Sequence, residues 1–154
     1  MKPIKLKLRG FLTYKEDIEI DFTKLYEKKI FLISGDTGSG KTSIFDAINF
    51  ALYGSISRQV PIDRLRSDFL NGKDPFTYVN LIFQASGKSY EIERIPSQIA
   101  RKSKDFQDIK HSVSLYELGD EKRLISEKIK ETEEKIIEII GLDQSQFSKV
   151  MLLA

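Results

Sequence analysis

The chain of 154 residues contains no cysteine and a single histidine, His111. Without thiols it forms neither disulfides nor thiolate metal sites. One histidine without a second ligand of its kind does not make a transition-metal site, so we expect His111 to be an ordinary surface residue.

The longest apolar runs fall far short of the roughly 20 residues that a membrane-spanning helix needs, and the N-terminus lacks the apolar segment of a secretory signal. We therefore expect a cytoplasmic protein with no membrane partner.

A large excess of one sign of charge is also missing. The 25 basic and 23 acidic residues leave a formal net charge of +2, which neither requires nor excludes nucleic acid as a partner. Contacts with DNA would have to come from local basic clusters. Hydrophobic residues make up 40% of the chain, which at this length is enough for one sizeable core. The sequence has no internal repeat, and a single globular domain is expected.

The sequence does contain a complete phosphate-loop (P-loop) pattern, G-x-x-x-x-G-K-[ST], over residues 35–42. It follows the apolar run Ile30-Phe31-Leu32-Ile33, which predicts a central strand, and it precedes a helical pattern. Glycines in such a loop expose backbone N–H groups to phosphate, and the positive N-terminal end of the helix faces the same anion. The alternative is a merely Gly-rich turn between strand and helix. The residues predicted to bind ATP are Gly35, Asp36, Thr37, Gly38, Ser39, Gly40, Lys41, Thr42 and Ser43.

Two residues of this loop have predicted chemical roles. Lys41 is expected to reach the β- and γ-phosphates as the catalytic residue of the chain, and the Thr42 hydroxyl is expected to ligate Mg²⁺. The Mg²⁺ arrives with the nucleotide and needs further ligands from outside this chain. Residues 139–143 are similar to a Walker B strand, in which apolar residues precede an Asp. However, Gln144 follows at the position where a Walker B motif has its catalytic Glu. We interpret this segment as a helix end, and we expect the isolated chain to be poorly stable and not to hydrolyse ATP.

Hydrophobic periodicity predicts the strands. Period-two alternation indicates strands at residues 4–9 and 18–22, which form a β-hairpin or meander before the P-loop strand, and hairpins at residues 78–94 and 112–125. Loops are predicted at residues 55–75, with room for one short helix, and at residues 95–111, where apolar content is low.

Helical spacing predicts two helices and a further C-terminal element. The first follows the P-loop and ends at Gly54. The second is expected to be capped by Ser126 and ended by Gly141, with Glu131 and Lys135 as a favourable i,i+4 pair. The further element is expected over residues 144–154.

Several short segments outside the P-loop form a further pattern. They are Phe11-Leu12-Thr13-Tyr14, Asp46-Ala47-Ile48, Ala51-Leu52-Tyr53-Gly54, Leu65-Arg66-Ser67-Asp68-Phe69, residues 90–94, Ile125-Ser126-Glu127-Lys128, Gly141-Leu142-Asp143, Gln146-Phe147 and Val150-Met151-Leu152-Leu153. In this order, together with the P-loop, they resemble the SbcC type of DNA-repair ATPase, a relative of SMC proteins in the ABC-ATPase class. The resemblance covers nearly the whole chain. It implies an α/β fold, the N-terminal lobe of a P-loop NTPase of the ABC-ATPase head type, with a mixed or antiparallel sheet and a parallel core that contains the P-loop strand-helix unit.

The resemblance also implies how the rest of the protein is organised. In this family the head is assembled from two ends of one long chain joined by a coiled coil. Residues 1–154 would be its N-terminal segment, ending one residue before the Q-loop glutamine, and the C-terminal half of the head would be its first partner. The other implied partners are a second head bound through ATP as a homodimer, an SbcD-like nuclease, and double-stranded DNA at the nucleoid. ATP would drive head dimerisation and gate nuclease access to DNA ends and hairpins in repair and recombination.

Basic residues supply the candidate DNA contacts. The group Arg101, Lys102, Lys104 and Lys110 is predicted to bind DNA phosphates, because such contacts need only positive charge that reaches the backbone. The alternative is a solvated loop. The group Lys5, Lys7 and Arg9 is interpreted as the solvent face of a strand, and it is the second choice for DNA.

Three other functions stay open at this point. An SMC-like structural ATPase without a nuclease partner would share the P-loop. A GTPase or small-molecule kinase is less favoured, since guanine recognition uses N-K-x-D and residues 71–74 have the wrong order. A non-catalytic nucleotide-binding module would explain the lack of a water-activating group.

By the family resemblance, Phe11, Thr13 and Tyr14 would line the base side of the nucleotide pocket, with core packing as the alternative.

Overall fold

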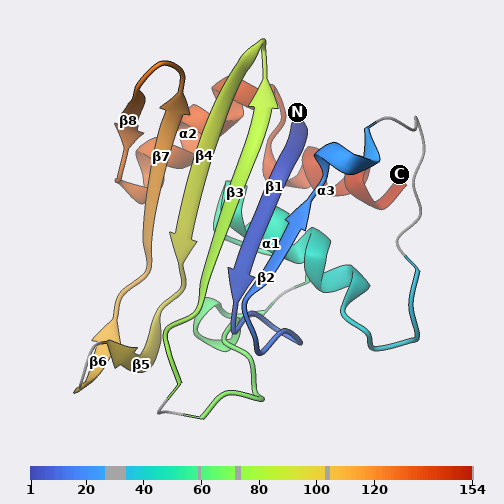
Figure 1. Cartoon of the computed structure of the whole chain (residues 1–154). Helices are drawn as coiled ribbons and strands as arrows, with labels where there is room; N and C mark the ends of the chain where they lie inside the picture. Colours follow the sequence, from blue (N-terminus) through green and yellow to red (C-terminus); the bar gives the residue numbers. More distant parts are fainter. Residues whose placement is uncertain (27–33, 59, 72–73, 103–104, 154) are drawn as a thin grey trace.

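The computed structural model describes residues 1–26, 34–58, 60–71, 74–102 and 105–153 (Figure 1). In chain order the elements are β1 (Lys2–Arg9), β2 (Ile18–Asp21), η1 (Thr23–Leu25), α1 (Lys41–Tyr53), η2 (Ile62–Arg64), β3 (Tyr78–Ala85), β4 (Lys88–Ile95), β5 (Gln98–Lys102), β6 (Asp105–Ile109), β7 (Ser112–Leu118), β8 (Lys122–Ser126), α2 (Ile129–Ile140) and α3 (Gln144–Leu153). The predicted P-loop strand at residues 30–33 lies outside the described residues. The parallel core expected around it therefore stays a prediction.

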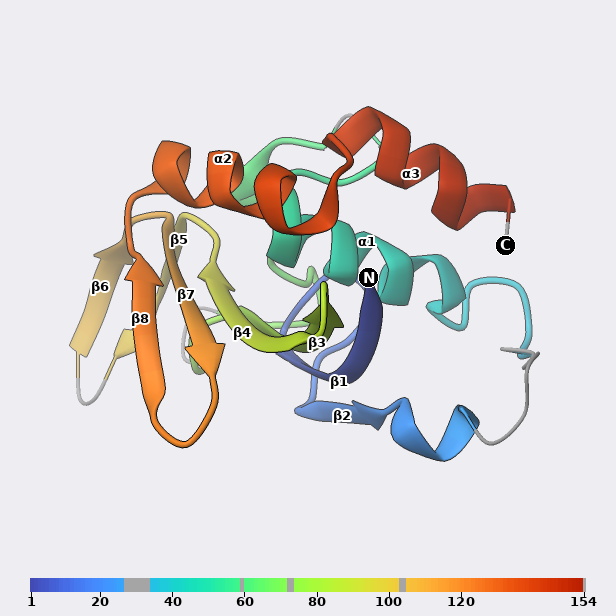
Figure 2. The same ribbon diagram turned by 90° about the horizontal axis from the view of Figure 1, so that it is seen from above.

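Six strands form one sheet in the order β2-β1-β3-β4-β7-β8, and every pair in it is antiparallel. The alternating sequence of β1 places Leu6 and Leu8 on the covered face, where neither side chain is exposed. All three α-helices lie on that same side of the sheet (Figure 2). The α/β fold with an antiparallel sheet is thereby confirmed.

Helix α1 is the centre of the core. Ten of its thirteen residues are buried, because the sheet covers one side of the helix while α2 and α3 cover another (Figure 2). Phe147 of α3 packs on Tyr53 with ring centroids 5.5 Å apart. Gly54 ends α1 in the left-handed conformation, and its N–H bonds the Phe50 carbonyl, as predicted. The P-loop therefore leads into the best-anchored helix of the molecule.

The segment at residues 95–111, predicted to be a loop, instead contains a β-hairpin. Strands β5 and β6 pair antiparallel, from Gln98 opposite Ile109 to Lys102 opposite Asp105. A two-stranded ribbon is held mainly by its backbone ladder, so it needs few apolar side chains and leaves little hydrophobic pattern to detect. Ile99 is 69% exposed, whereas Ala100 is fully buried.

The predicted capping of α2 is also wrong in detail. Ser126 is the last residue of β8, and the N-cap of α2 is Lys128, which makes no side-chain cap bond. The Lys128 N–H donates to Ser126 Oγ at 3.3 Å, so the serine supports the turn before the helix. Lys135 pairs at 2.7 Å with Glu138, not with the predicted Glu131. The end of the helix at Gly141 is confirmed.

Candidate nucleotide-binding site

The P-loop is shaped by glycines whose backbone conformation other residues rarely adopt. Gly38 has φ +86°, and Gly40, the N-cap of α1, has φ +91°. A Cβ atom at Gly40 would lie 2.7 Å from Thr13 Oγ1 and 3.0 Å from the Tyr14 hydroxyl oxygen. Gly40 is therefore required both by its conformation and by the close approach of the turn at residues 11–14.

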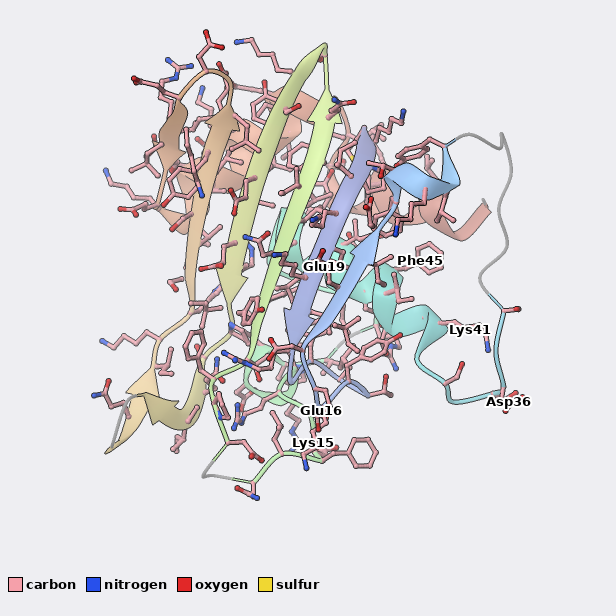
Figure 3. All side chains as sticks on the ribbon, viewed as in Figure 1. Lys15, Glu16, Glu19, Asp36, Lys41 and Phe45 are labelled. Carbon is pink, nitrogen blue, oxygen red and sulfur yellow. The ribbon has the colours of Figure 1, made fainter. Side chains whose placement is uncertain are left out.

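Lys41 folds back across the P-loop. Its ammonium donates to the Gly35 carbonyl and, at 2.8 Å, to the Asp36 carbonyl, and it lies 3.4 Å from Ser39 Oγ. Figure 3 shows Lys41 and Asp36 where this loop leads into α1. Neutral carbonyls are weaker acceptors for an ammonium than phosphate oxygens are. Phosphate oxygens would therefore compete well with the loop carbonyls for the Lys41 ammonium.

The turn at residues 11–14 is bonded to the start of α1. The Tyr14 hydroxyl donates to the Gly40 carbonyl at 3.2 Å, and burial raises the pKa of this hydroxyl. Thr13 Oγ1 donates to Ser43 Oγ at 3.2 Å. Phe11 is fully buried and packs on Phe50 at 5.5 Å. Of the three residues predicted near the nucleotide base, Phe11 thus serves the core, Tyr14 fixes the P-loop, and Thr13 faces the adjoining cavity.

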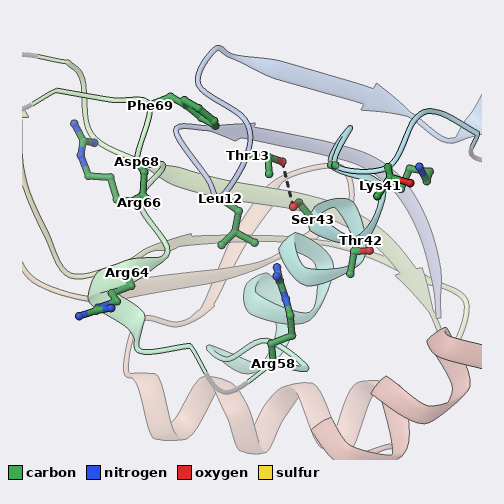
Figure 4. Close-up of a pocket in the computed structure, with 13 residues that line it drawn as sticks. Leu12, Thr13, Lys41, Thr42, Ser43, Arg58, Arg64, Arg66, Asp68 and Phe69 are labelled. Atoms are coloured by element: carbon green, nitrogen blue, oxygen red, sulfur yellow. Dashed lines mark hydrogen bonds between the residues drawn. The ribbon is translucent and has the colours of Figure 1, made fainter.

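A cavity of about 590 Å³ adjoins the P-loop (Figure 4), a size within the usual range for small-molecule sites. It is lined by Leu12, Thr13, Thr37, Gly38, Gly40, Lys41, Thr42, Ser43, Arg58, Arg64, Arg66, Asp68 and Phe69. Four of these residues are cationic and one is anionic, so the described lining suits a polyanion. Arg58 is also bound at 2.6 Å to the buried carboxylate of Asp46 on α1.

The structure thus adds site residues that the sequence did not identify. Arg58, Arg64 and Arg66 follow the P-loop helix within a short irregular segment, and Phe69, which is 69% exposed, completes that wall. The presence of three arginines close together after the P-loop helix is the sequence signal that could have indicated this part of the site. The predicted P-loop residues line the cavity from Thr37 to Ser43, except Ser39, while Gly35 and Asp36 contact Lys41.

The predicted DNA-contacting residues lie away from the P-loop. Arg101 and Lys102 belong to β5, Lys110 is exposed just before β7, and Lys104 lies outside the described residues. Figures 1 and 2 place the β5–β6 hairpin and the P-loop on opposite sides of the molecule.

The basic residues of β1 are ion-paired on the open face of the sheet. Lys5 and Lys7 bind Glu19 at 3.0 and 3.1 Å, and Arg9 lies 3.5 Å from Asp17. This geometry supports the interpretation of these residues as a solvent face.

His111 is not the surface residue that the sequence predicted. Its ring stacks on Phe50 with centroids 6.1 Å apart, and Nε2 lies 3.4 Å from Nη1 of Arg94. Burial and then the charge of Arg94 lower the pKa of His111 to about 4. Among the described residues, no three His, Cys, Asp or Glu side chains gather as metal ligands, and no helix is long and apolar enough to cross a membrane.

Comparison with known proteins identifies relatives across the whole chain. The SbcC subunit of nuclease SbcCD from Vibrio cholerae serotype O1 is 40% identical over 157 residues, which cover 99% of this chain and 15% of that protein. The same subunit from Staphylococcus aureus strain MRSA252 is 39% identical over 155 residues, with the same coverage. The chain thus spans 15% of the length of these relatives.

A solved structure from work on ATP-driven dimerization and DNA-stimulated activation of SMC ATPases shares the fold, with a TM-score of 0.56 and 22% identity over 90% of this chain and 77% of that one. A family model described as an AAA domain matches residues 5–154. That range includes the P-loop, the arginine-lined cavity and nearly the whole sheet. The predicted resemblance to an SbcC-type ATPase head is confirmed, and the chain belongs to the AAA domain family.

Proposed function

We propose that this chain is the N-terminal, nucleotide-binding segment of an ATPase head in an SbcC–SbcD-like nuclease complex that processes DNA ends and hairpins in repair and recombination. ATP would hold two heads together, and its hydrolysis would change the access of the nuclease to DNA. The observation that carries this proposal is the cationic cavity at the N-terminal end of α1, which is lined by P-loop residues including Lys41 on one side and by a wall that carries Arg58, Arg64 and Arg66 on the other. A triphosphate is the common metabolite that this arrangement suits best.

Within the cavity, the chain positions phosphates and neutralises their charge. Backbone N–H groups of residues 38–42 and the end of α1 would hold the β- and γ-phosphates, with Lys41 moving from its loop carbonyls to the terminal phosphate. The exposed hydroxyl of Thr42 is a hard oxygen donor of the kind that Mg²⁺ accepts. Bound Mg²⁺ would supply further neutralisation of the transferred phosphoryl group.

The remaining parts of the active site would come from other segments of the protein. Among the described residues that line the cavity, Asp68 is the one carboxylate, and it lies on the wall opposite the P-loop helix (Figure 4). We therefore propose that the C-terminal half of the head and a second head supply the water-orienting group and the further Mg²⁺ ligands. The isolated chain would then bind nucleotide without turnover.

The decisive experiment is calorimetric titration of ATP into the assembled head carrying Lys41→Ala. Loss of a charge-assisted contact to phosphate is expected to weaken binding about 100-fold. The matched control is Lys15→Ala, which removes an exposed lysine outside the cavity and should leave ATP affinity unchanged. Equal affinity of the two variants would remove the proposal. Competition by GTP as strong as by ATP would favour a different class of P-loop protein.

DNA binding is proposed for the β5–β6 hairpin and the residue that follows it, through Arg101, Lys102, Lys104 and Lys110. Basic residues that neutralise phosphates release counterions, so the logarithm of the affinity should fall linearly with the logarithm of salt concentration. Replacing the four residues by Glu in the full complex should weaken duplex binding and flatten its salt dependence, whereas Lys5→Glu should not, because Lys5 is already ion-paired. An unchanged salt slope would mean that the hairpin is only a solvated ribbon.

The second candidate is an SMC-like structural ATPase without a nuclease partner, which the fold similarity favours. Co-purification distinguishes the two proposals. An SbcC-like head should bind an SbcD-like nuclease, while an SMC-like head should bind ATP and DNA without it.

A further inference from the structure

One buried amide side chain joins the wall of the cavity to the base of the β5–β6 hairpin. Gln98, the first residue of β5, is 6% exposed. Its Oε1 accepts from the Thr77 N–H at 2.6 Å and from Arg66 Nη1 at 3.1 Å. Its Nε2 donates to the carbonyls of Thr77 at 2.8 Å and Pro96 at 3.1 Å. All four hydrogen-bonding positions of the amide are occupied, so its orientation is fixed.

Arg66 ties the same amide to the cavity. It lines the cavity, yet its guanidinium points into the segment that follows it. Nη1 donates to Pro75 O at 2.9 Å, to Thr77 Oγ1 at 3.2 Å and to Gln98. Nη2 donates to Asn71 O and Asp74 O, both at 3.3 Å. A rigid planar donor with this many partners holds its segment, including the cavity residues Asp68 and Phe69, as one unit.

Thr77 extends the connection to the other wall of the cavity. Its side chain is fully buried, and Oγ1 donates to the Gly10 carbonyl at 2.8 Å. The same carbonyl accepts from the Ser67 N–H at 2.7 Å. Gly10 has no room for a side chain, because a Cβ there would lie 2.8 Å from Thr77 Oγ1. The turn at residues 11–14, which is bonded to the P-loop, follows directly. Arg66 therefore joins one wall of the cavity to Gln98 directly, and Thr77 joins the other wall to it through Gly10.

We infer that Gln98 is a positioning residue through which nucleotide in the cavity and the placement of the β5–β6 hairpin influence each other. This inference rests on the proposed function, since it requires nucleotide in the cavity. A ligand that draws the two walls together moves Arg66 and Thr77, and the fixed amide passes that movement to the first residue of β5. By thermodynamic reciprocity, a ligand that fixes the hairpin changes nucleotide affinity by the same factor.

The test is hydrogen exchange of the β5 and β6 amides in the assembled head, with and without saturating AMP-PNP. In the unmodified protein the nucleotide should slow exchange in the hairpin about fivefold or more, the lower end of typical coupling between sites. Gln98→Ala should bind AMP-PNP with nearly unchanged affinity but lose this response. Gln98→Glu retains acceptors for Arg66 and the Thr77 N–H but places an oxygen against the carbonyls of Thr77 and Pro96, so it should keep only part of the response. Gln107→Ala, an exposed glutamine on β6, is the matched control and should respond fully.

A hairpin response in Gln98→Ala equal to that of the control would overturn the inference, as would bound nucleotide with no response in the unmodified protein. If Gln98→Ala does not fold, Thr77→Val takes its place, because it deletes the hydroxyl bonds to Gly10 and Arg66 with little change of shape. A full response in Thr77→Val would then overturn the inference. Failure of the proposed function is distinct, since AMP-PNP would not bind the unmodified head at all.

Discussion

The two ends of α1 carry opposite partial charges, and they differ in whether the chain itself supplies the compensating charge. A helix leaves unpaired N–H groups at its start and unpaired carbonyls at its end, so it favours an anion at the first and a cation at the second. At the end of α1 the cation is part of the chain: Arg94 is fully buried, and it donates from Nε to Ala51 O at 3.1 Å and from Nη2 to Leu52 O at 3.3 Å. At the start, the described P-loop residues that line the cavity supply donors and no carboxylate. The chain itself supplies the charge at one end of the helix, and the other end is suited to an anionic ligand.

We call the C-terminal end of α1, which Arg94 covers, the closed end, and the N-terminal end at the P-loop the open end. Several groups surround Arg94 at the closed end. Nη1 of Arg94 lies 3.4 Å from His111 and 3.9 Å from Glu133 of α2, and the guanidinium carbon lies 6.0 Å from the centre of the Phe50 ring. Burial lowers the pKa of Arg94 to about 10, against the opposing effect of Glu133. Arg94 therefore stays charged at neutral pH. We expect the closed end to determine stability and the open end to determine ligand binding.

The largest expected effect comes from Arg94→Met. It leaves buried carbonyls of α1 without donors and should lower the free energy of unfolding of the assembled head by about 3–5 kcal/mol. Arg123→Met is the control, because Arg123 is exposed and its ion pair with Glu117 at 3.3 Å should contribute less than about 1 kcal/mol. Denaturant titration measures both. Equal stability of the two variants would contradict the assignment of Arg94 as the stabilising cation.

A smaller effect is expected from glycine substitutions at the two ends. Gly54→Ala would place a Cβ 2.6 Å from Arg94 Nη1 at φ +73° and should cost about 2 kcal/mol of stability. Gly40→Ala meets the movable side chains of Thr13 and Tyr14, so it should cost less stability but weaken ATP binding about tenfold by displacing the P-loop. Thermal unfolding and calorimetry measure the two quantities.

The control for these substitutions is Gly87→Ala in the β3–β4 turn. Gly87 has φ +77°, and a Cβ added there would meet nothing within 4 Å, so Ala at this position reports backbone strain alone. A loss of ATP affinity in Gly54→Ala as large as in Gly40→Ala would show that the two ends are not separable.

The P-loop and the glycine that ends α1 were predictable from sequence, whereas the buried cation at the closed end was not. The P-loop is a contiguous pattern, and Gly54 and Gly141 end helices by local conformation, so neighbouring residues suffice to identify them. Arg94 meets α1 across more than 40 positions of the sequence, and nothing in its own strand indicates this. The burial of His111 could not be predicted for the same reason, because it depends on contact with Phe50.

The arginine-lined cavity and the β5–β6 hairpin needed the structure as well. Arg58, Arg64 and Arg66 lie in a segment without hydrophobic periodicity, and their place on the cavity wall depends on long-range contacts such as Gly10 with Ser67 and Leu12 with Leu65. The hairpin depends on a backbone ladder among mostly polar residues. Sequence patterns report local conformation and one-sided burial, whereas these features depend on which segments meet.

The smallest expected effect is a dependence of stability on pH through His111 at the closed end. Its pKa is about 4 in the folded protein against an ordinary value of 6.5, so the unfolded chain binds the proton first as the pH falls. Stability should therefore be unaffected by this group above about pH 7, decrease between pH 6.5 and pH 4, and level off below that range. For a half-buried ring that solvent partly screens, we expect a loss of about 1–2 kcal/mol.

The measurement is the difference in free energy of unfolding between the unmodified head and His111→Gln at each pH, in which the titration of the carboxylates cancels. A difference that stays constant from about pH 7 to about pH 4 would show that neither burial nor Arg94 lowers the pKa of His111 below that of a surface histidine. The ring should also titrate closer to 6.5 by NMR in Arg94→Met, provided that this variant folds, because both the positive charge and part of the packing around the ring are then removed.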